Sequence, residues 1–147
     1  MGEIPQLMIL CHSHRQAMLA HILACFPEEG CGLVGGRFGP GGVRAEAVLP
    51  VANQDHSPVR FSMEPNELVK ALYWLDENSL DLTAIFHSHP GGPAGPSATD
   101  LAEFAYPGVL YLILSPDRDR LGWQTRAYWI DGHGQVVEVP LGWDATC

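Results

Sequence analysis

The feature that most constrains this chain is a pair of histidines at the end of a short apolar segment. Residues 82–86 read Leu-Thr-Ala-Ile-Phe, a run that predicts a buried β-strand. Successive side chains alternate across a strand, so His87 and His89 are expected on one face and Ser88 on the other. Two imidazoles placed in this way can bind one metal ion, and Asp100 is a plausible third ligand.

Simpler interpretations of the same residues exist. A single His-x-His pair on a strand is a motif of low specificity. Ser97 and Asp100 also have the spacing of a helix capping box, with Ser97 as the N-cap. Such a cap is compatible with metal binding, because it would fix Asp100 on the first helical turn. Three protein ligands would leave a fourth tetrahedral position for water, which is the arrangement of catalytic zinc sites.

The combined string is more specific than its parts. Residues 87–100 read H-S-H-P-x5-P-S-x-x-D and resemble the signature of the JAMM metallopeptidases, also called MPN+ domains. That signature includes an upstream glutamate, and residues 27–36 resemble its surroundings with Glu29 at the catalytic position. Residues 53–67 resemble a third family segment, through Asn53, Pro58, Phe61, Met63 and Pro65. The resemblance covers about residues 7–139.

The resemblance implies a short, bacterial-type member of this family with one zinc ion per chain. It implies a fold of cytidine-deaminase-like architecture. The expected substrate is a ubiquitin-like or sulfur-carrier protein, cut at an amide or isopeptide bond after its C-terminal Gly-Gly. The chain lacks room for the two insertions with which eukaryotic deubiquitinases of the family grip a ubiquitin chain.

The chemistry of such a site requires distinct roles. His87, His89 and Asp100 are the predicted zinc ligands. Glu29 is the predicted general base, since a carboxylate near the attacking water can take its proton and deliver it to the leaving amine. The residues alone do not separate Glu29 from Glu28, and it is the family spacing that favours Glu29. Ser97 is the predicted donor to the oxyanion that develops on the attacked carbonyl.

Rival functions are distinguishable by motif. A zinc deaminase would need an H-x-E and a P-C-x-x-C pair, and the sequence has neither. A non-catalytic scaffold domain of the same fold is the main alternative, but such domains usually lack the ligand set that is present here. A peptidase acting on cell-wall peptides is a further alternative, against which the absence of an export signal argues.

Composition narrows the setting. The 147 residues predict one domain, residues 1–147. The net charge of −9, with Lys70 as the single lysine, argues against nucleic-acid and anionic-membrane partners. The sequence has no signal peptide and no membrane-spanning apolar run, so a cytoplasmic location is expected. The expected assembly is a monomer or homodimer. The four cysteines lack C-x-x-C spacing and are expected to be free thiols, with Cys31 a small buried residue.

Periodicity and turn residues predict an α/β (α+β) domain, with a mixed, curved β-sheet flanked by helices. Helices are expected from a Ser13 cap to Pro27, from Pro65, and over about 99–105. Glycines in 31–35 suggest a close backbone approach, and the Gly/Pro-rich loop 91–96 is a candidate rim of the site. Strands are expected at residues 7–10, 31–35, 43–49, 61–63, 82–86, 109–114, 124–130 and 135–139.

Overall fold

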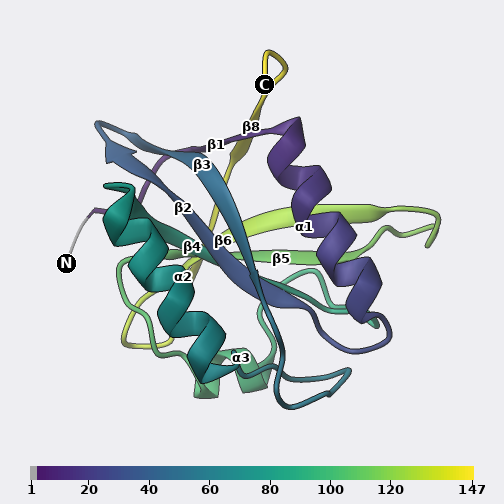
Figure 1. Ribbon diagram of the computed structural model, residues 1–147. Coiled ribbons are helices and arrows are strands. Elements are labelled where there is room, and N and C mark those ends of the chain that lie inside the picture. The colour runs from purple at the N-terminus through teal and green to yellow at the C-terminus, as the bar shows by residue number, and fades with distance from the viewer. Residues whose placement is uncertain (1–2) are drawn as a thin grey trace.

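The fold is one mixed, curved sheet of eight strands with three helices, described for residues 3–147 by a computed structural model (Figure 1). The strand order is β7-β6-β5-β4-β2-β3-β1-β8. The predicted α/β (α+β) fold class is confirmed. The elements in chain order are β1 (Met8–Cys11), α1 (His12–Cys25), β2 (Cys31–Gly39), β3 (Gly42–Val51), α2 (Pro65–Glu77), β4 (Asp81–Ser88), α3 (Ala98–Ala102), β5 (Leu110–Pro116), β6 (Trp123–Ile130), β7 (Val136–Val139) and β8 (Leu141–Asp144).

Strand β4 lies inside the sheet, antiparallel to β2 and parallel to β5. Its side chains supply two apolar cores on opposite faces, because neighbouring residues of a strand point in opposite directions. Ala84 and Phe86 belong to the core that also contains Met18 and Ile22 of α1. Ile85 belongs to the core that also contains Ala71 and Leu75 of α2. Figure 1 shows these two helices on opposite sides of the sheet, with α3 near the start of α2.

Two of the three helices begin as the sequence predicts. Pro65 is the first residue of α2, and the Glu64 side chain accepts hydrogen bonds from backbone N–H groups of the first turn. Ser97 caps α3, in the predicted capping box with Asp100. The predicted Ser13 cap of α1 is wrong. The chain passes directly from β1 into α1 at His12, and the Cys11 N–H donates to His14 Nδ1 at 3.0 Å.

The predicted set of strands needs two corrections. The segment 61–63 is not a strand of the sheet, and forms one isolated bridge between Asn53 and Met63. Conversely, β8 was not predicted. It pairs in parallel with β1 at the edge of the sheet, and its four residues, Leu-Gly-Trp-Asp, show no clear alternation of apolar and polar side chains.

The expectation of free thiols is wrong for two of the four cysteines. Cys11 and Cys147 form a disulfide, with Cα atoms 5.2 Å apart. The parallel pairing places Cys11 opposite Asp144, so a short turn after β8 brings Cys147 back to Cys11. Cys25 and Cys31 are free thiols. Cys31 is fully buried, as predicted, and this burial raises the pKa of its thiol to about 12.

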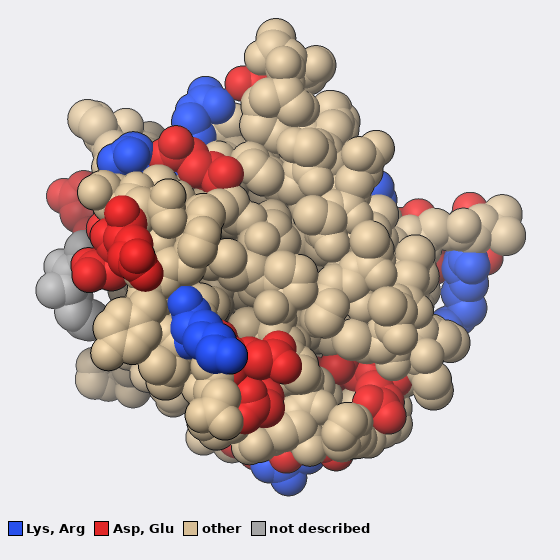
Figure 2. Space-filling model, in the orientation of Figure 1, with Lys and Arg blue, Asp and Glu red and all other residues tan. Residues whose placement is uncertain are grey.

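Charged side chains are unevenly spread over the surface. Figure 2 shows acidic and basic groups mainly on the left and in the lower part of this view, and a broad uncharged area across its centre and upper right. That area includes the surface over α1, whose sequence contains Arg15 as its one Lys, Arg, Asp or Glu. Within residues 3–147, none of the helices is both long and apolar enough to cross a lipid bilayer.

Candidate active site

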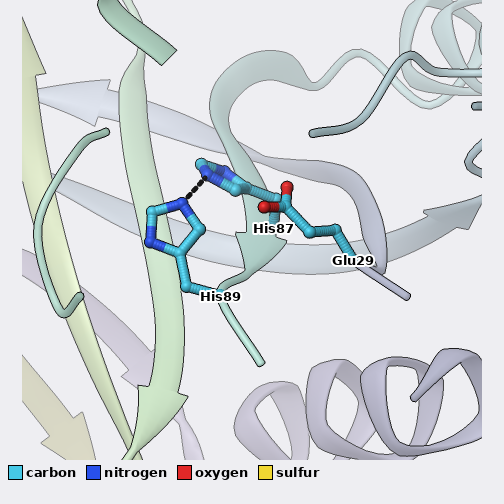
Figure 3. A group of neighbouring side chains, drawn as sticks. All are labelled: Glu29, His87 and His89. Carbon is cyan, nitrogen blue, oxygen red and sulfur yellow. Dashed lines mark hydrogen bonds between the residues drawn. The ribbon is translucent and has the colours of Figure 1, made fainter. Parts of the chain in front are cut away.

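The two histidines of the His-x-His pair converge at the C-terminal end of β4. His87 lies between Cys31 of β2 and Ile113 of β5 in the sheet register. The His87 and His89 Nε2 atoms are 3.0 Å apart, and Figure 3 shows the two rings meeting at this contact. Ser88 points away, where its Oγ accepts a hydrogen bond from the Gly30 N–H at 2.8 Å. The alternation expected from the sequence is therefore present.

Asp100 brings a carboxylate oxygen to the same point. Its Oδ2 atom lies 3.2 Å from His87 Nε2 and 3.0 Å from His89 Nε2. The cap of α3 fixes this placement, since the Ser97 N–H donates to Asp100 Oδ2 at 2.9 Å and the Asp100 N–H donates to Ser97 Oγ at 3.0 Å. Capping and convergence on the histidines are thus two properties of one carboxylate.

The geometry of these three groups fits a metal ion. A tetrahedral ion with bonds of about 2.1 Å separates its ligand atoms by about 3.4 Å. The three separations here, between 3.0 and 3.2 Å, are close to that value. The His89 Nδ1 atom lies 2.8 Å from the Pro93 carbonyl oxygen. A donated Nδ1–H at this contact leaves the lone pair of His89 Nε2 directed at the common centre.

Electrostatics agree with a site built for a cation. Burial alone would raise the pKa of Asp100, but hydrogen bonds from His87 and His89 outweigh it and hold that pKa well below its usual range. Burial lowers the pKa of His87, which is 1% exposed. Burial opposes protonation of His89 as well, but the hydrogen bonds to Asp100 and Pro93 and the charges of Asp100 and Glu29 together outweigh it, so the pKa of His89 is raised. The Asp100 carboxylate thus remains charged beside two imidazoles, one with a lowered pKa (His87) and one with a raised pKa (His89).

Glu29 is the fourth group at this centre. It lies between α1 and β2, is 2% exposed, and Figure 3 shows its carboxylate beside His87. Ligand atoms of Glu29, His87 and His89 lie within 4.8 Å of one another. Among residues 3–147, no group hydrogen-bonds to Glu29 Oε1. Burial raises the pKa of this carboxyl to about 8, although the charge of His89 opposes the shift.

Comparison with known proteins identifies the family. Residues 10–131 match the family described as prokaryotic homologs of the JAB domain. The chain belongs to this family. A solution structure of a Desulfitobacterium hafniense protein superimposes with a TM-score of 0.83 at 34% identity, covering 94% of this chain and 93% of the other. This membership and this structural likeness confirm the family and the fold that the sequence signature implied.

Two relatives of the JAB-family chain have informative names. A Thermus thermophilus protein named "Probable TtuB-protein conjugate cleaving protease" is 41% identical over 67% of this chain, and the match spans 63% of that protein. A Mycobacterium bovis protein named "CysO-cysteine peptidase" is 31% identical, with the match covering 85% of this chain and 83% of the other. The first name describes a protease that cleaves a protein conjugate, and the second a peptidase that acts on CysO-cysteine.

The structure separates the two adjacent carboxylates of this JAB-family chain. Glu29 faces the histidines, whereas Glu28 points to the surface, where its Oε1 atom lies 3.2 Å from His56 Nδ1. The other histidines that could suggest a site lie elsewhere. His14 accepts from the Cys11 N–H, and His21 Nε2 contacts the Val51 carbonyl oxygen at 3.2 Å.

Ser97 stands at the edge of the centre as the N-cap of α3. Its Oγ atom accepts a hydrogen bond from the Asp100 N–H, so its own O–H remains free to donate. Activation of Ser97 as a nucleophile would require a free imidazole base. Both nearby imidazoles, those of His87 and His89, are engaged with Asp100. The Ser97 O–H is thus available as a hydrogen-bond donor at this position.

A cleft with a volume of about 360 Å³ flanks His87 and Asp100. One wall is the loop 53–63, whose Phe61 ring stacks on the His87 imidazole with centroids 4.5 Å apart. Residues of α3 and of the segment after it also line the cleft, with further apolar side chains from the sheet. Large apolar lining residues are Phe61, Met63, Leu68, Ile85, Phe104, Tyr106 and Tyr111.

The sequence did not predict how the flanking loops are held. The loop 91–96, expected as a rim, is tied down, because the Pro93 and Ala94 carbonyl oxygens contact His89 Nδ1 and the Tyr128 O–H. Phe61 and Asn53 belong to the third family segment, but neither the ring stacking on His87 nor the contacts of Asn53 follow from spacing. The stacking of Phe61 on His87 and the bond from Asn53 to Glu29 join residues that are distant in sequence, and such contacts leave no local pattern.

Proposed function

We propose that this protein is a zinc-dependent peptidase. It would cleave the amide or isopeptide bond after the C-terminal Gly-Gly of a ubiquitin-like or sulfur-carrier protein. The observation that carries this proposal is the convergence of His87 Nε2, His89 Nε2 and Asp100 Oδ2 beside the buried carboxylate of Glu29. Three ligands with an adjacent base form the minimal equipment of a hydrolytic metal site.

His87, His89 and Asp100 would hold the zinc ion. When bound, zinc supplies Lewis acidity, which polarises a carbonyl and lowers the pKa of water from about 15.7 toward 7. The nitrogen and oxygen ligands and their single common point suit zinc. The contact of His89 Nδ1 with Pro93, and the cap that fixes Asp100, hold two of the ligands in place before any ion arrives.

Glu29 would act as the general base. Its Oε1 atom is buried and unpartnered within residues 3–147, so it can accept the proton of an attacking water without first breaking another contact. Its pKa of about 8 reflects burial, and a nearby cation favours the charged form of a carboxylate. Protonated Glu29 would then return the proton to the leaving amine.

Ser97 would stabilise the oxyanion. Its oxygen already accepts from the Asp100 N–H, which orients the hydroxyl and leaves its hydrogen available. A donor placed toward a developing negative charge, rather than toward the ground-state carbonyl, accelerates the reaction. The helix cap that fixes Asp100 therefore also fixes this donor.

The burial of the site supports a substrate with a Gly-Gly tail. Glu29, His87 and His89 are each at most 3% exposed. A carbonyl can reach such groups when the chain that carries it has no bulky side chains beside the scissile bond, and glycine meets this condition. The names of the Thermus and Mycobacterium relatives, which refer to a TtuB-protein conjugate and to CysO-cysteine, support a protein carrier as the substrate class.

The test is direct. The purified protein should contain one zinc ion per chain by elemental analysis. It should release cysteine from a sulfur-carrier protein that ends in Gly-Gly-Cys, as detected by mass spectrometry. The same carrier ending in Ala-Ala-Cys is the matched control and should be cleaved much more slowly. A metal-free protein, or equal cleavage of both carriers, would contradict the proposal, and the former result would favour a scaffold domain.

A further inference from the structure

The position of Glu29 depends on its backbone. Residues 26–30 form neither a helix nor a strand of the sheet, so no regular ladder holds this segment. Within residues 3–147 no group hydrogen-bonds to Glu29 Oε1, although the carboxyl is buried. A general base must stand within hydrogen-bond reach of the proton that it takes. Something other than its own carboxylate contacts must therefore place this side chain.

Both backbone groups of Glu29 are held by one neighbouring loop. The Glu29 N–H donates to the Ser57 carbonyl oxygen at 2.8 Å. The Glu29 carbonyl oxygen accepts from Asn53 Nδ2 at 3.0 Å, in a buried hydrogen bond. The next residue, Gly30, is bound instead to Ser88 of β4. The loop 53–63 thus holds the backbone of Glu29, and strand β4 holds the backbone of Gly30.

A single side chain, that of Asn53, holds this arrangement together. It is 6% exposed, and its carboxamide makes four hydrogen bonds. Nδ2 donates to the carbonyl oxygens of Glu29 and Arg60, while Oδ1 accepts from the N–H groups of Asp55 and Ser62. Four is the full capacity of two N–H donors and one oxygen with two lone pairs. A buried carboxamide used completely is expensive to replace.

The loop that Asn53 organises is also a wall of the cleft. Phe61 and Met63 of this loop line the cleft beside His87, and Arg60 is ion-paired with Glu103 across it. We propose that Asn53 is a positioning residue, which fixes the general base by hydrogen-bonding its carbonyl and joins it to the loop 53–63. This inference rests on the proposed peptidase function and adds a role that the metal ligands do not provide.

Loss of the hydrogen bond from Asn53 to the Glu29 carbonyl should affect turnover more than substrate binding. A displacement of about 1 Å in a catalytic group can cost on the order of 10²-fold in rate. The proposed metal ligands are His87 in β4, His89 directly after β4 and Asp100 in α3, and none of the side-chain hydrogen bonds of Asn53 reaches them. Zinc content should therefore remain at the wild-type value while kcat falls.

Two substitutions and one matched control test the proposal. Asn53→Asp keeps an oxygen for Asp55 and Ser62 but turns the second oxygen toward the Glu29 carbonyl, where a donor is needed. Asn53→Ala removes all four bonds. Gln54→Ala is the control, since the Gln54 side chain bonds Ser62 Oγ in the same loop but does not reach Glu29.

Cleavage of the Gly-Gly-Cys carrier should separate the variants. Both Asn53 variants, measured as folded and zinc-loaded protein well below their melting temperatures, should lose on the order of 10²-fold in kcat. KM should stay nearly unchanged in Asn53→Asp, which keeps the bonds to Asp55 and Ser62, and should rise in Asn53→Ala, which also frees the wall of the cleft. Gln54→Ala should retain wild-type kcat. The proposal is overturned if Asn53→Asp keeps wild-type kcat. It is equally overturned if Gln54→Ala loses as much, because the loop as a whole would then be responsible.

A second readout does not depend on activity. Hydrogen exchange of the Glu29 N–H, followed by NMR, reports whether its bond to the Ser57 carbonyl stays closed. Asn53→Asp should accelerate this exchange roughly tenfold, the change expected for loss of about one hydrogen bond, and Gln54→Ala should not. Unchanged exchange in Asn53→Asp refutes the positioning role. If the wild-type protein cleaves no Gly-Gly carrier, the peptidase proposal fails, and exchange still decides whether Asn53 holds this segment.

Discussion

At the scale of single residues, the clearest lesson is that two adjacent carboxylates have unequal environments. Glu29 is 2% exposed beside the histidines, whereas Glu28 lies at the surface against His56. A change of carboxylate to amide keeps the shape of the side chain but removes its ability to accept a proton. The pair therefore offers a test of the base with an internal control.

Glu29→Gln should retain zinc and lose catalysis. General-base contributions are typically 10²–10⁴-fold, and we expect kcat to fall by about that factor while elemental analysis still finds one zinc ion per chain. Glu28→Gln should keep wild-type kcat. Full activity of Glu29→Gln would show that another group takes the proton.

His87→Ala and Asp100→Asn should lose the metal itself. The Asp100 substitution separates two roles, because an asparagine oxygen can still accept from the Ser97 N–H and preserve the cap of α3. For Asp100→Asn we expect the melting temperature of the metal-free protein to be almost unchanged. For both variants we expect zinc affinity to fall so far that dialysis against a weak chelator removes the ion. Stoichiometric zinc after dialysis of both variants would refute the ligand assignment.

Cys31 should be chemically inert even though it follows Glu29 by two residues. Burial raises the pKa of its thiol to about 12, so at pH 8 almost none of it is the reactive thiolate. Cys25 is partly exposed and should be alkylated first by iodoacetamide, as followed by peptide mass spectrometry. Raising the pH toward 12 increases the thiolate fraction of Cys31 and should speed its labelling. Equal labelling of the two thiols at pH 8 would contradict this assignment.

At the scale of elements, what could be predicted was local. The alternation of β4, the Pro65 start of α2 and the Ser97 cap depend on neighbouring residues, and each is present. The missed features depend on contacts that no periodicity encodes. Strand β8 pairs with β1, which lies far away along the chain, and the segment 61–63 bends into the loop that the Asn53 side chain holds instead of extending the sheet.

The glycine-containing strand β2 carries a prediction of its own. A Cβ atom on Gly32 would meet the Phe86 ring and would lie 2.6 Å from the Leu49 carbonyl oxygen. The close backbone approach suggested by the sequence is therefore present at this position. Gly32→Ala should destabilise the protein by about 1–3 kcal/mol, the usual cost of overpacking, as measured by urea unfolding. Gly39→Ala, where nothing lies within 4 Å, should be nearly neutral.

At the scale of the whole molecule, sequence separation limited the prediction of the cysteines. Cys11 and Cys147 are 136 residues apart, and they pair because β8 lies next to β1. Cysteine spacing in the sequence does not predict that neighbourhood. Cys25 and Cys31 are closer in sequence, yet both are free. The disulfide thus joins the segment after β8, the strand at the sheet's edge, to β1, after which α1 begins.

Reduction of this disulfide should weaken the fold without reaching the site directly. A cross-link that closes so long a loop removes much freedom from the unfolded chain, and typical disulfides contribute roughly 2–4 kcal/mol. We expect the urea midpoint of the wild-type protein to fall when dithiothreitol is added, and that of Cys147→Ser to be low already and insensitive to the reductant. Cys25→Ser, which leaves the disulfide intact, should respond to dithiothreitol as the wild type does. Identical wild-type midpoints with and without reductant, together with a free Cys11 thiol in a non-reduced digest, would show that the two sulfurs do not pair in solution.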